Sequence, residues 1–513
     1  MKNNLQIFLL LTVASLLIFS SCGPKKTTIH YADLKNPKRE FRGAWLHTIG
    51  QGQYRNMTSA QMQQYFVDVL DKFQEVGINA VIFQVRPQAD AFYKSDLEPW
   101  SRYLTGVQGK APDSGFDPLT FLVNECHKRN MELHAWMNPY RVTSAEGQAL
   151  APSHIYNRYP ERFVKYGTQT YFDPGIPENR EFICQVVKDI IARYDVDAIH
   201  MDDYFYPYPI AGKSFPDDAS FARYAPEQGF ANNQRSDWRR NNVNVLIQEI
   251  KQTIMRNKPW VRFGISPFGI YRNKKSDATG SDTNGLQNYD DLYADIKLWV
   301  EKDWIDYNIP QVYWEIGHKA ADYNTLVEWW AKNNFYKHLY IGQDVKRTMD
   351  AQTPSGNTQL ADKFIKARSY PQVDGNCFWS GYVLLDNYKG VYGELVNNYH
   401  RYPALIPAYL HLHDKAPKDI KKIREEYTET NHMLVWDRNG NPADPVKAQY
   451  YVVYRFAKGE AKNTGNARNI VAITRDTRVV LPYEGGKNKY EYVVTSVDRF
   501  HNESKGKSKK VTL

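Results

Sequence analysis

Short apolar runs alternate with longer amphipathic segments through residues 41–403 of this 513-residue chain. The runs have the composition and alternation of β-strands, whereas the longer segments place apolar residues at helical spacing. The predicted strands are residues 41–47, 79–87, 132–141, 196–203, 262–268, 305–315, 339–344 and 375–380. The predicted helices are residues 58–73, 117–129, 178–194, 235–256 and 289–302, with another near Leu395.

Eight β/α units in this order predict a (β/α)8 TIM barrel over residues 41–403, because eight parallel strands with crossover helices can close into a ring. A doubly wound sheet is the alternative, but no glycine-rich phosphate loop follows the first strand. The pattern then changes. Residues 404–422 form a Pro- and Lys-containing linker, and residues 423–513 hold short strands separated by turn signals. This last part predicts a small β-sandwich that resembles a fibronectin type III domain.

The first residues have the pattern of a targeting segment. Lys2 precedes an apolar run that ends in Ser20-Ser21-Cys22, and the run is too short for a membrane-spanning helix. Small residues before a cysteine are typical of a bacterial lipoprotein signal. We therefore predict a signal peptide at residues 1–21, lipidation of Cys22 and a tether over residues 22–40. The residues after Cys22 favour an outer-membrane anchor that faces the periplasm.

Charge and cysteine content exclude several other classes of protein. The formal net charge is +9, but no basic stripe of the nucleic-acid type is present, so the excess suits an anionic polysaccharide better. Cys126, Cys184 and Cys377 are too scattered for a disulfide framework or a metal cluster. A metal centre of His47, His200 and Asp202 lacks supporting motif spacing. We expect no cofactor, no nucleic-acid partner and a monomer.

Carboxylates follow the fourth and sixth predicted strands, where the active site of a TIM barrel is built. Glycoside hydrolysis needs one carboxylic acid to protonate the leaving oxygen and a second carboxylate as nucleophile or base. Asp202 shares a strand face with His200, so Asp202 is the first choice for the second role and Asp203 is the alternative. Glu315 is the predicted acid. An adjacent Asp pair also permits substrate-assisted catalysis on N-acetyl sugars.

Other polar and aromatic residues at the strand ends are predicted to bind substrate. Arg86 and Arg141 could instead pair with the acids, and the histidines could be structural. The predicted binding residues are His47, Gln84, Arg86, Asn138, Arg141, His200, Tyr204, Gln311, Tyr313, Trp314 and Asp344. Trp45, Trp136 and Trp379 could add stacking platforms, although packing is the stronger expectation for Trp45 and Trp136.

Six ordered motifs resemble the glycosyl hydrolase-10-like family of bacterial proteins, which are often lipoproteins. They are FRGAW (41–45), FQVRP (83–87), AWMNPYR (135–141), HMDDYFYP (200–207), ISPFG (265–269) and PQVYW (310–314). The resemblance implies a TIM barrel with glycosidase activity, and one branch of the family is associated with peptidoglycan strands stripped of stem peptides. Family-10 xylanases use Glu on strands four and seven; strand seven here offers only Asp344, so xylanase activity is not implied.

Together these observations predict a lipid-anchored glycoside hydrolase that acts on a cell-envelope glycan, with the glycan strands of peptidoglycan as the expected substrate. Two alternatives stay open from the sequence: a glycan-binding lipoprotein without turnover, and a glycosidase for an imported dietary or host polysaccharide.

Overall fold

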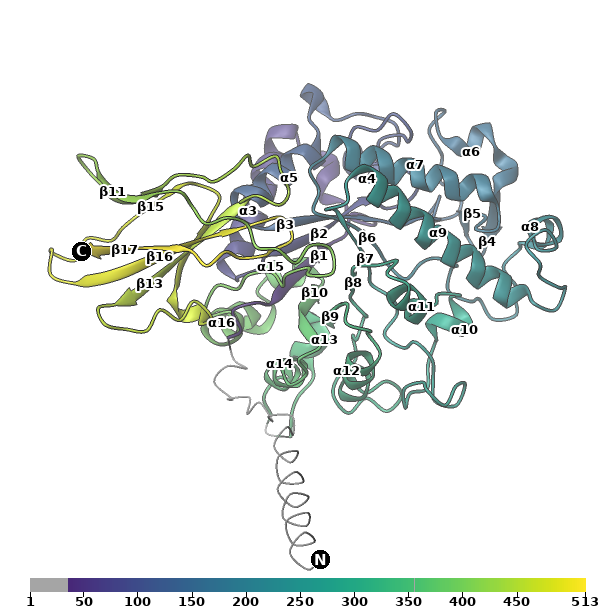
Figure 1. The fold of residues 1–513 in the computed structure, drawn as a ribbon. Coiled ribbons are helices and arrows are strands. Elements are labelled where there is room, and N and C mark those ends of the chain that lie inside the picture. Colours follow the sequence, from purple (N-terminus) through teal and green to yellow (C-terminus); the bar gives the residue numbers. More distant parts are fainter. Residues whose placement is uncertain (1–35, 355) are drawn as a thin grey trace, which may run out of the picture.

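The computed structural model describes residues 36–354 and 356–513, and a closed parallel barrel lies at its centre (Figure 1). In the described chain the barrel strands neighbour one another in the order β1-β10-β9-β8-β7-β6-β3-β2. The predicted TIM barrel is confirmed, and each of its strands overlaps a predicted one, although several are shorter than predicted. Their bounds are β1 Phe41–Leu46, β2 Ala80–Arg86, β3 Glu132–Met137, β6 Ala198–Met201, β7 Arg262–Ile265, β8 Tyr307–Asn308, β9 His338–Asp344 and β10 Val373–Trp379.

Helices cover the outside of the barrel, and their ends follow local sequence signals. Thr58 and Gln61 form a capping box at the start of α3, and Asp117 caps α5 ahead of Pro118. The larger helices are α3 Ser59–Glu75, α5 Pro118–Lys128, α7 Pro177–Arg193, α9 Arg235–Asn257, α12 Tyr323–Lys332 and α14 Leu360–Arg368. Shorter ones are α4 Arg102–Thr105, α6 Ile155–Arg158, α8 Asp218–Tyr224, α10 Asn288–Asp291, α11 Ile296–Glu301, α13 Val345–Asp350, α15 Gly381–Leu385 and α16 Val391–Glu394. A small hairpin, β4 Phe163–Tyr166 and β5 Gln169–Phe172, lies between α6 and α7.

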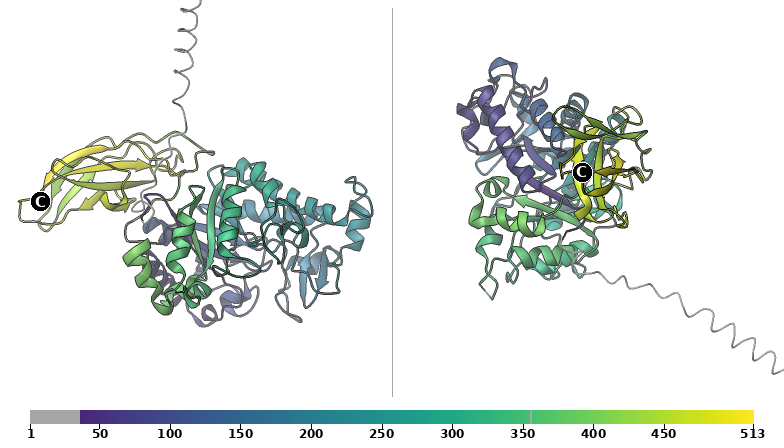
Figure 2. Two further views of the ribbon diagram at one scale, coloured as in Figure 1. Left: turned by 90° about the horizontal axis from the view of Figure 1, so that it is seen from below. Right: turned by 90° about the vertical axis from the view of Figure 1, so that its left-hand side faces the viewer.

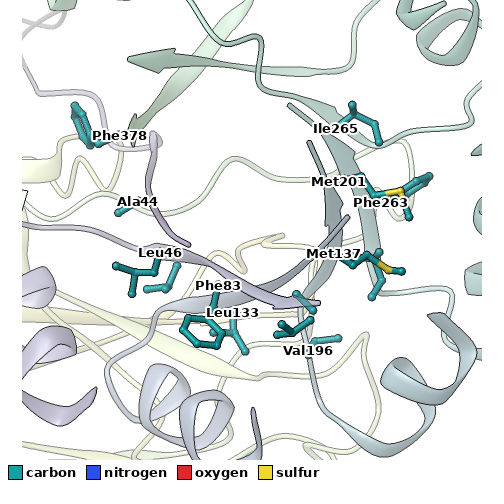
Figure 3. Close-up of a cluster of buried hydrophobic side chains, with 14 of the residues drawn as sticks. Ala44, Leu46, Phe83, Leu133, Met137, Val196, Met201, Phe263, Ile265 and Phe378 are labelled. Carbon is teal, nitrogen blue, oxygen red and sulfur yellow. The ribbon is translucent and has the colours of Figure 1, made fainter. Parts of the chain in front are cut away.

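Alternate side chains of the barrel strands face these helices and form the main hydrophobic core (Figure 3). Successive strand residues point to opposite faces, so one half of each strand builds this outer core and the other half fills the barrel. The labelled outward-facing residues in Figure 3 include Leu46, Leu133, Met201, Phe263 and Phe378.

The barrel interior is filled mainly by aromatic side chains rather than by small aliphatic ones. Phe41 stacks on Tyr340 with ring centroids 3.9 Å apart, and the ring of Tyr307 lies beside them. Gly264 makes room for Tyr307, because a Cβ at position 264 would lie 1.9 Å from the tyrosine ring. The inward face of the strands is therefore close-packed, except at the end of the barrel where the strands finish.

One predicted strand is much shorter than expected. The pattern predicted residues 305–315, whereas β8 spans Tyr307–Asn308 and Gln311 forms only isolated bridges with Phe268 and Gly342. Pro310 has no N–H to donate to a neighbouring strand, so the regular ladder ends before it. Residues 310–315 therefore run as a loop above the barrel.

The C-terminal part is an antiparallel β-sandwich, as predicted. Its three-stranded sheet has the order β11-β12-β15 and its four-stranded sheet the order β14-β13-β16-β17. The sheets share a core that includes Trp436 and Tyr451. The strands are β11 Ile423–Tyr427, β12 His432–Trp436, β13 Tyr450–Ala457, β14 Ile470–Thr474, β15 Arg478–Val480, β16 Lys489–Val497 and β17 Lys507–Thr512.

The sandwich lies beside the barrel (Figure 2) and contacts the end where the strands begin. Nε2 of His501 lies 2.6 Å from Oε1 of Glu132, the first residue of β3, and Glu132 also pairs with Arg262 at the start of β7. Arg499 forms a second ion pair with Asp195. The two parts of the chain are thus joined by a buried polar contact, at the opposite end of the barrel from the cavity.

Across the described residues, every helix is too short or too polar to cross a lipid bilayer. The predicted lipidation site, Cys22, lies outside the described residues.

Candidate active site

A cavity of about 650 Å³ opens at the end of the barrel where the strands finish. Side chains from the ends of several strands and from the loops that follow them line it. They are Trp45, His47, Ile49, Gln84, Trp136, Arg141, Ser144, Gln169, Asp202, Asp203, Tyr204, Tyr208, Ser266, Phe268, Gln311, Tyr313, Trp314, Asp344, Arg347 and Trp379. This volume is sufficient for a small ligand or for part of a polymer.

Asp202 is held at the base of the cavity by three N–H donors. Its Oδ2 accepts from Nε1 of Trp136 (3.1 Å), and its Oδ1 accepts from Nδ2 of Asn138 (3.2 Å) and from the backbone N–H of Tyr204 (3.1 Å). Burial raises the pKa of Asp202, while the nearby charge of Arg141 and these donors oppose the increase. The donors orient the carboxylate and favour its ionised form.

Asp203 has a different environment, although it is the next residue in the chain. Gln311 donates to its Oδ1 (3.0 Å), and the hydroxyl of Tyr208 donates to its Oδ2. Burial, followed by the neighbouring charge of Asp202, raises the pKa of Asp203 to about 6. Asp203 can therefore hold a proton close to neutral pH.

Four aromatic side chains surround the space beside Asp202. The rings of Trp136 and Trp379 have centroids 6.2 Å apart, and Tyr313 lies nearly parallel to Trp379 at 6.5 Å. Trp45 meets Tyr313 edge-on at 6.4 Å. We call Trp45, Trp136, Tyr313 and Trp379 the aromatic cup; all four line the cavity.

A chain of buried hydrogen bonds supports the cup from inside the barrel. The indole N–H of Trp45 donates to Nε2 of His200 (3.3 Å), so Nδ1 of the neutral ring carries the proton and faces the hydroxyl of Tyr307 (3.1 Å). That hydroxyl then donates to Nδ1 of His134 (2.8 Å), whose Nε2–H reaches Glu132 (2.8 Å). Burial lowers the pKa of His200 well below its usual value, which keeps the ring neutral. His200 thus orients Trp45.

Most of the predicted binding residues line the cavity. These are His47, Gln84, Arg141, Tyr204, Gln311, Tyr313, Trp314 and Asp344, together with the predicted platforms Trp45, Trp136 and Trp379. The guanidinium of Arg141 lies 4.8 Å from the ring centroid of Tyr204. Burial lowers the pKa of His47 to about 4, so this ring is neutral at physiological pH.

Glu315 is not where the sequence predicted it. It follows Trp314 in the loop after Pro310 but is not among the residues that line the cavity. Its charge lies near the buried Lys363, where it opposes the lowering of the lysine pKa by burial. The early end of β8 explains the difference: alternation along an extended strand cannot be carried past the proline into a loop. The predicted pairing of Glu315 with Asp202 across a sugar is therefore not found.

Three predicted binding residues support the site from behind. Arg86 is fully buried, pairs with Glu98 through two nitrogens and donates to the carbonyl of Pro139. It neither lines the cavity nor pairs with Asp202 or Asp203. Asn138 and His200 are likewise completely buried and act on Asp202 and Trp45 respectively. None of these three side chains is among the residues that line the cavity.

The sequence prediction missed several residues of the site. Tyr208 donates to Asp203 from the loop after β6, and Arg347 reaches the cavity from α13. Ser144 and Gln169 come from the segment between β3 and α7. Tyr208 lies in an aromatic, proline-rich loop directly after the acids, which is the one signal that could have indicated it; the other three carry no motif.

Within residues 36–354 and 356–513, no group of three or more His, Cys, Asp or Glu side chains is arranged to hold a metal ion.

A TIM barrel whose cavity holds two carboxylates with different hydrogen-bond donors among aromatic side chains is typical of glycoside hydrolases. The family comparison agrees. Residues 40–357 match the glycosyl hydrolase-like 10 family, and the chain belongs to this family. It is an enzyme that hydrolyses O-glycosyl bonds.

Two curated relatives extend this result. The chain is 41% identical over 485 residues to glycosyl hydrolase YngK of Bacillus subtilis, covering 92% of this chain and 93% of the relative. It is 38% identical over 333 residues to glycosyl hydrolase DigH of Escherichia coli, covering 61% of this chain and 74% of the relative. Among solved structures, the PgaB glycoside hydrolase domain of Bordetella bronchiseptica is similar with a TM-score of 0.47 and 10% identity, covering 69% of this chain and 98% of that domain.

Proposed function

We propose that this glycoside hydrolase is a lipid-anchored enzyme of the cell envelope that cleaves the glycan strands of peptidoglycan. The observation that carries the proposal is the pair Asp202 and Asp203, which share one cavity but accept hydrogen bonds from different donors, with the pKa of Asp203 raised to about 6. In this proposal Asp203 is the general acid that protonates the leaving glycosidic oxygen. Asp202 is the ionised partner.

The difference between the two carboxyl groups supports these roles. A general acid works best when its pKa lies near the working pH, and a pKa of about 6 keeps Asp203 partly protonated there. Asp202 accepts from three N–H groups and faces Arg141, which all favour its charge. In this proposal Asp203 donates the proton, and the neighbouring Asp202 carries the negative charge.

Two arginines in the cavity support an anionic glycan as substrate. Arg141 and Arg347 both line the cavity, where Arg141 lies against the ring of Tyr204 and donates to the backbone carbonyl of Pro87. Peptidoglycan strands without stem peptides expose the carboxylate of each muramic acid lactyl group, and guanidinium groups bind carboxylates well. The net charge of +9 agrees with such a substrate.

The cellular location is a proposal from the signal-like segment that ends at Cys22. Lipidation there would place the enzyme at the outer membrane facing the periplasm, within reach of the peptidoglycan layer. Labelling cells with an alkyne-tagged fatty acid and comparing the wild-type chain with Cys22→Ala tests the anchor. Loss of the label in Cys22→Ala is expected, whereas an unlabelled wild-type chain would contradict it.

Incubating the enzyme with amidase-treated sacculi and identifying soluble products by mass spectrometry tests the substrate. Wild type is expected to release soluble saccharides that carry no peptide. Asp202→Asn and Asp203→Asn are each expected to release at least about 100-fold less of them. Intact sacculi and a panel of dietary and host polysaccharides serve as comparison substrates. Preferred cleavage of a panel polysaccharide, or tight binding of wall glycan without cleavage, would reject the peptidoglycan assignment.

A further inference from the structure

The aromatic cup and Asp202 form a subsite with both apolar and polar parts. Trp45 and Trp136 are almost fully buried at its base, and Tyr313 and Trp379 are partly buried at its wall. The carboxylate of Asp202 accepts a hydrogen bond from Nε1 of Trp136 (3.1 Å), which fixes it at the edge of the cup. The subsite is therefore a small apolar pocket with an anionic acceptor fixed at its edge.

Tyr313 can add a hydrogen-bond donor to this pocket. The residue lines the cavity, its hydroxyl has no hydrogen-bond partner in the described part of the chain, and burial raises its pKa well above the usual value. It is thus a protonated phenol available to a ligand. The indole N–H groups of Trp45 and Trp136, by contrast, are already occupied by His200 and Asp202.

One acceptor, one donor and an apolar enclosure match the three parts of a secondary acetamide. The amide N–H would donate to Asp202, its carbonyl oxygen would accept from Tyr313, and its methyl group would lie against the indole rings. We propose that this subsite binds the 2-acetamido group of an N-acetylhexosamine and that Asp202 orients that group to take part in the reaction. This inference rests on the proposed function and names the sugar class and the role of Asp202.

The positions of the carboxylates in the cavity favour the substrate's acetamide as nucleophile over a carboxylate of the protein. Among the described lining residues only Asp202, Asp203 and Asp344 carry carboxylates, and Oδ1 of Asp344 accepts the backbone N–H of Arg347 at the start of α13. Asp202 and Asp203 are successive residues, bound by Trp136 and Tyr208 respectively, so both carboxylates come from the same strand end rather than from opposite sides of the barrel mouth. A group on the substrate itself can supply the nucleophile instead.

The reaction then proceeds in two balanced steps. The acetamide carbonyl oxygen forms a bond to C1 as the C1–O glycosidic bond breaks, and Asp203 gives its proton to the leaving oxygen. The positive charge of the resulting oxazolinium ion is stabilised by Asp202 through the amide N–H. Asp203, now ionised, takes a proton from water; the water oxygen bonds to C1, the ring opens, and the acetamide is restored with retained configuration at C1.

Binding of N-acetylglucosamine-thiazoline, a stable mimic of the cyclic intermediate, tests the subsite by calorimetry without any need for polymer cleavage. We expect wild type to bind it at least about 100-fold more tightly than N-acetylglucosamine, as intermediates and transition-state analogues bind. Asp202→Asn and Tyr313→Phe are each expected to weaken thiazoline binding by about tenfold or more. Glu315→Gln, outside the cavity, is the matched control and should bind like wild type.

Two outcomes would overturn the inference. Thiazoline that binds no better than N-acetylglucosamine would exclude the subsite, and so would mass-spectrometric detection of a 2-fluoro-sugar attached to the carboxylate of Asp202. The result is separable from the peptidoglycan assignment. If thiazoline binding depends on Asp202 but sacculi are not cleaved, the peptidoglycan substrate is rejected and the subsite is kept. If sacculi are cleaved but thiazoline does not bind, the subsite is rejected and the substrate is kept.

Discussion

The phenolic hydroxyl of Tyr208 donates to Oδ2 of Asp203, from a position five residues further along the same loop. A donor to a carboxylate favours its ionised form, so this contact lowers the pKa of Asp203. Burial and the charge of Asp202 act in the opposite direction and prevail, which leaves the pKa at about 6. Tyr208 therefore limits how far the pKa of Asp203, the proposed general acid, is raised.

Removing this donor is expected to move the alkaline side of the pH profile. In wild type, kcat/KM should fall as pH rises through about 6, because Asp203 then loses the proton that it must donate. In Tyr208→Phe the pKa of Asp203 rises, so the same fall should occur at higher pH. The measurement is the pH dependence of glycan release by both enzymes. An unchanged alkaline limb would show that another group donates the proton.

Replacing the carboxylate that lies outside the cavity should have little effect on activity. Glu315→Gln is expected to keep kcat/KM within about threefold of wild type, whereas Asp203→Asn should lose about 100-fold or more. The reason is position: Asp203 lines the cavity and Glu315 does not. Initial rates on the same glycan substrate decide between them. Loss of activity in Glu315→Gln with normal thermal stability would return the acid role to that residue.

Asp203 is expected to reduce the stability of the folded enzyme at neutral pH. Its pKa is about 6 in the fold against a usual value of 3.8, so ionisation is disfavoured by folding. Asp203→Asn should therefore raise the free energy of unfolding by about 1 to 3 kcal/mol above pH 6. The gain should decrease between pH 6 and pH 4 and vanish below the unfolded pKa, where both states bind the proton. Urea unfolding of both proteins at pH 7.5 and pH 4 checks the sign.

The aromatic filling of the barrel depends on a glycine. Gly264→Ala would place a Cβ 1.9 Å from the ring of Tyr307, so either the ring or the strand must move. We expect a loss of about 3 kcal/mol or more in stability. Gly52→Ala is the matched control, because no atom lies within 4 Å of a Cβ there, and it should change stability by less than about 0.5 kcal/mol. Similar melting temperatures for the two variants would contradict the packing.

The contact between the two domains should contribute to stability through its buried part. Glu132 accepts from Arg262, His134 and His501, so Glu132→Gln leaves the buried Arg262 without its counter-charge. We expect a loss of about 3 to 5 kcal/mol. Asp195→Asn breaks the more exposed pair with Arg499 at the same interface and should cost less than about 1 kcal/mol. Denaturant unfolding of both variants gives the comparison, and equal losses would contradict the importance of burial.

Much of the fold could be predicted because it depends on local patterns. Alternation along the strands placed His200 and Asp202 on one face, and the structure confirms that both point into the barrel or its cavity. The sequence predicted where α3 and α5 begin to within one residue, and it also predicted the change to short strands after residue 403. These features follow from backbone geometry and side-chain period, which act over a few residues.

The division of roles among polar residues could not be predicted in the same way. Asn138 and Arg141 are three residues apart, yet one is fully buried behind Asp202 and the other lines the cavity. Arg86 found its partner in Glu98, a loop residue that no strand pattern indicated. Whether a strand-end side chain faces a ligand or a neighbour depends on which loop covers it.

The sequence by itself determined the barrel, the sandwich, the family and the strand that carries the two aspartates, since hydrophobic period and ordered motifs are properties of the chain. Only the tertiary structure decided that Asp203 meets Tyr208 and Gln311, that Glu315 is outside the cavity, and that four aromatic rings surround the space beside Asp202. The physical reason is that burial and hydrogen-bond donors set the protonation of a carboxyl group, and both come from segments far apart in the sequence.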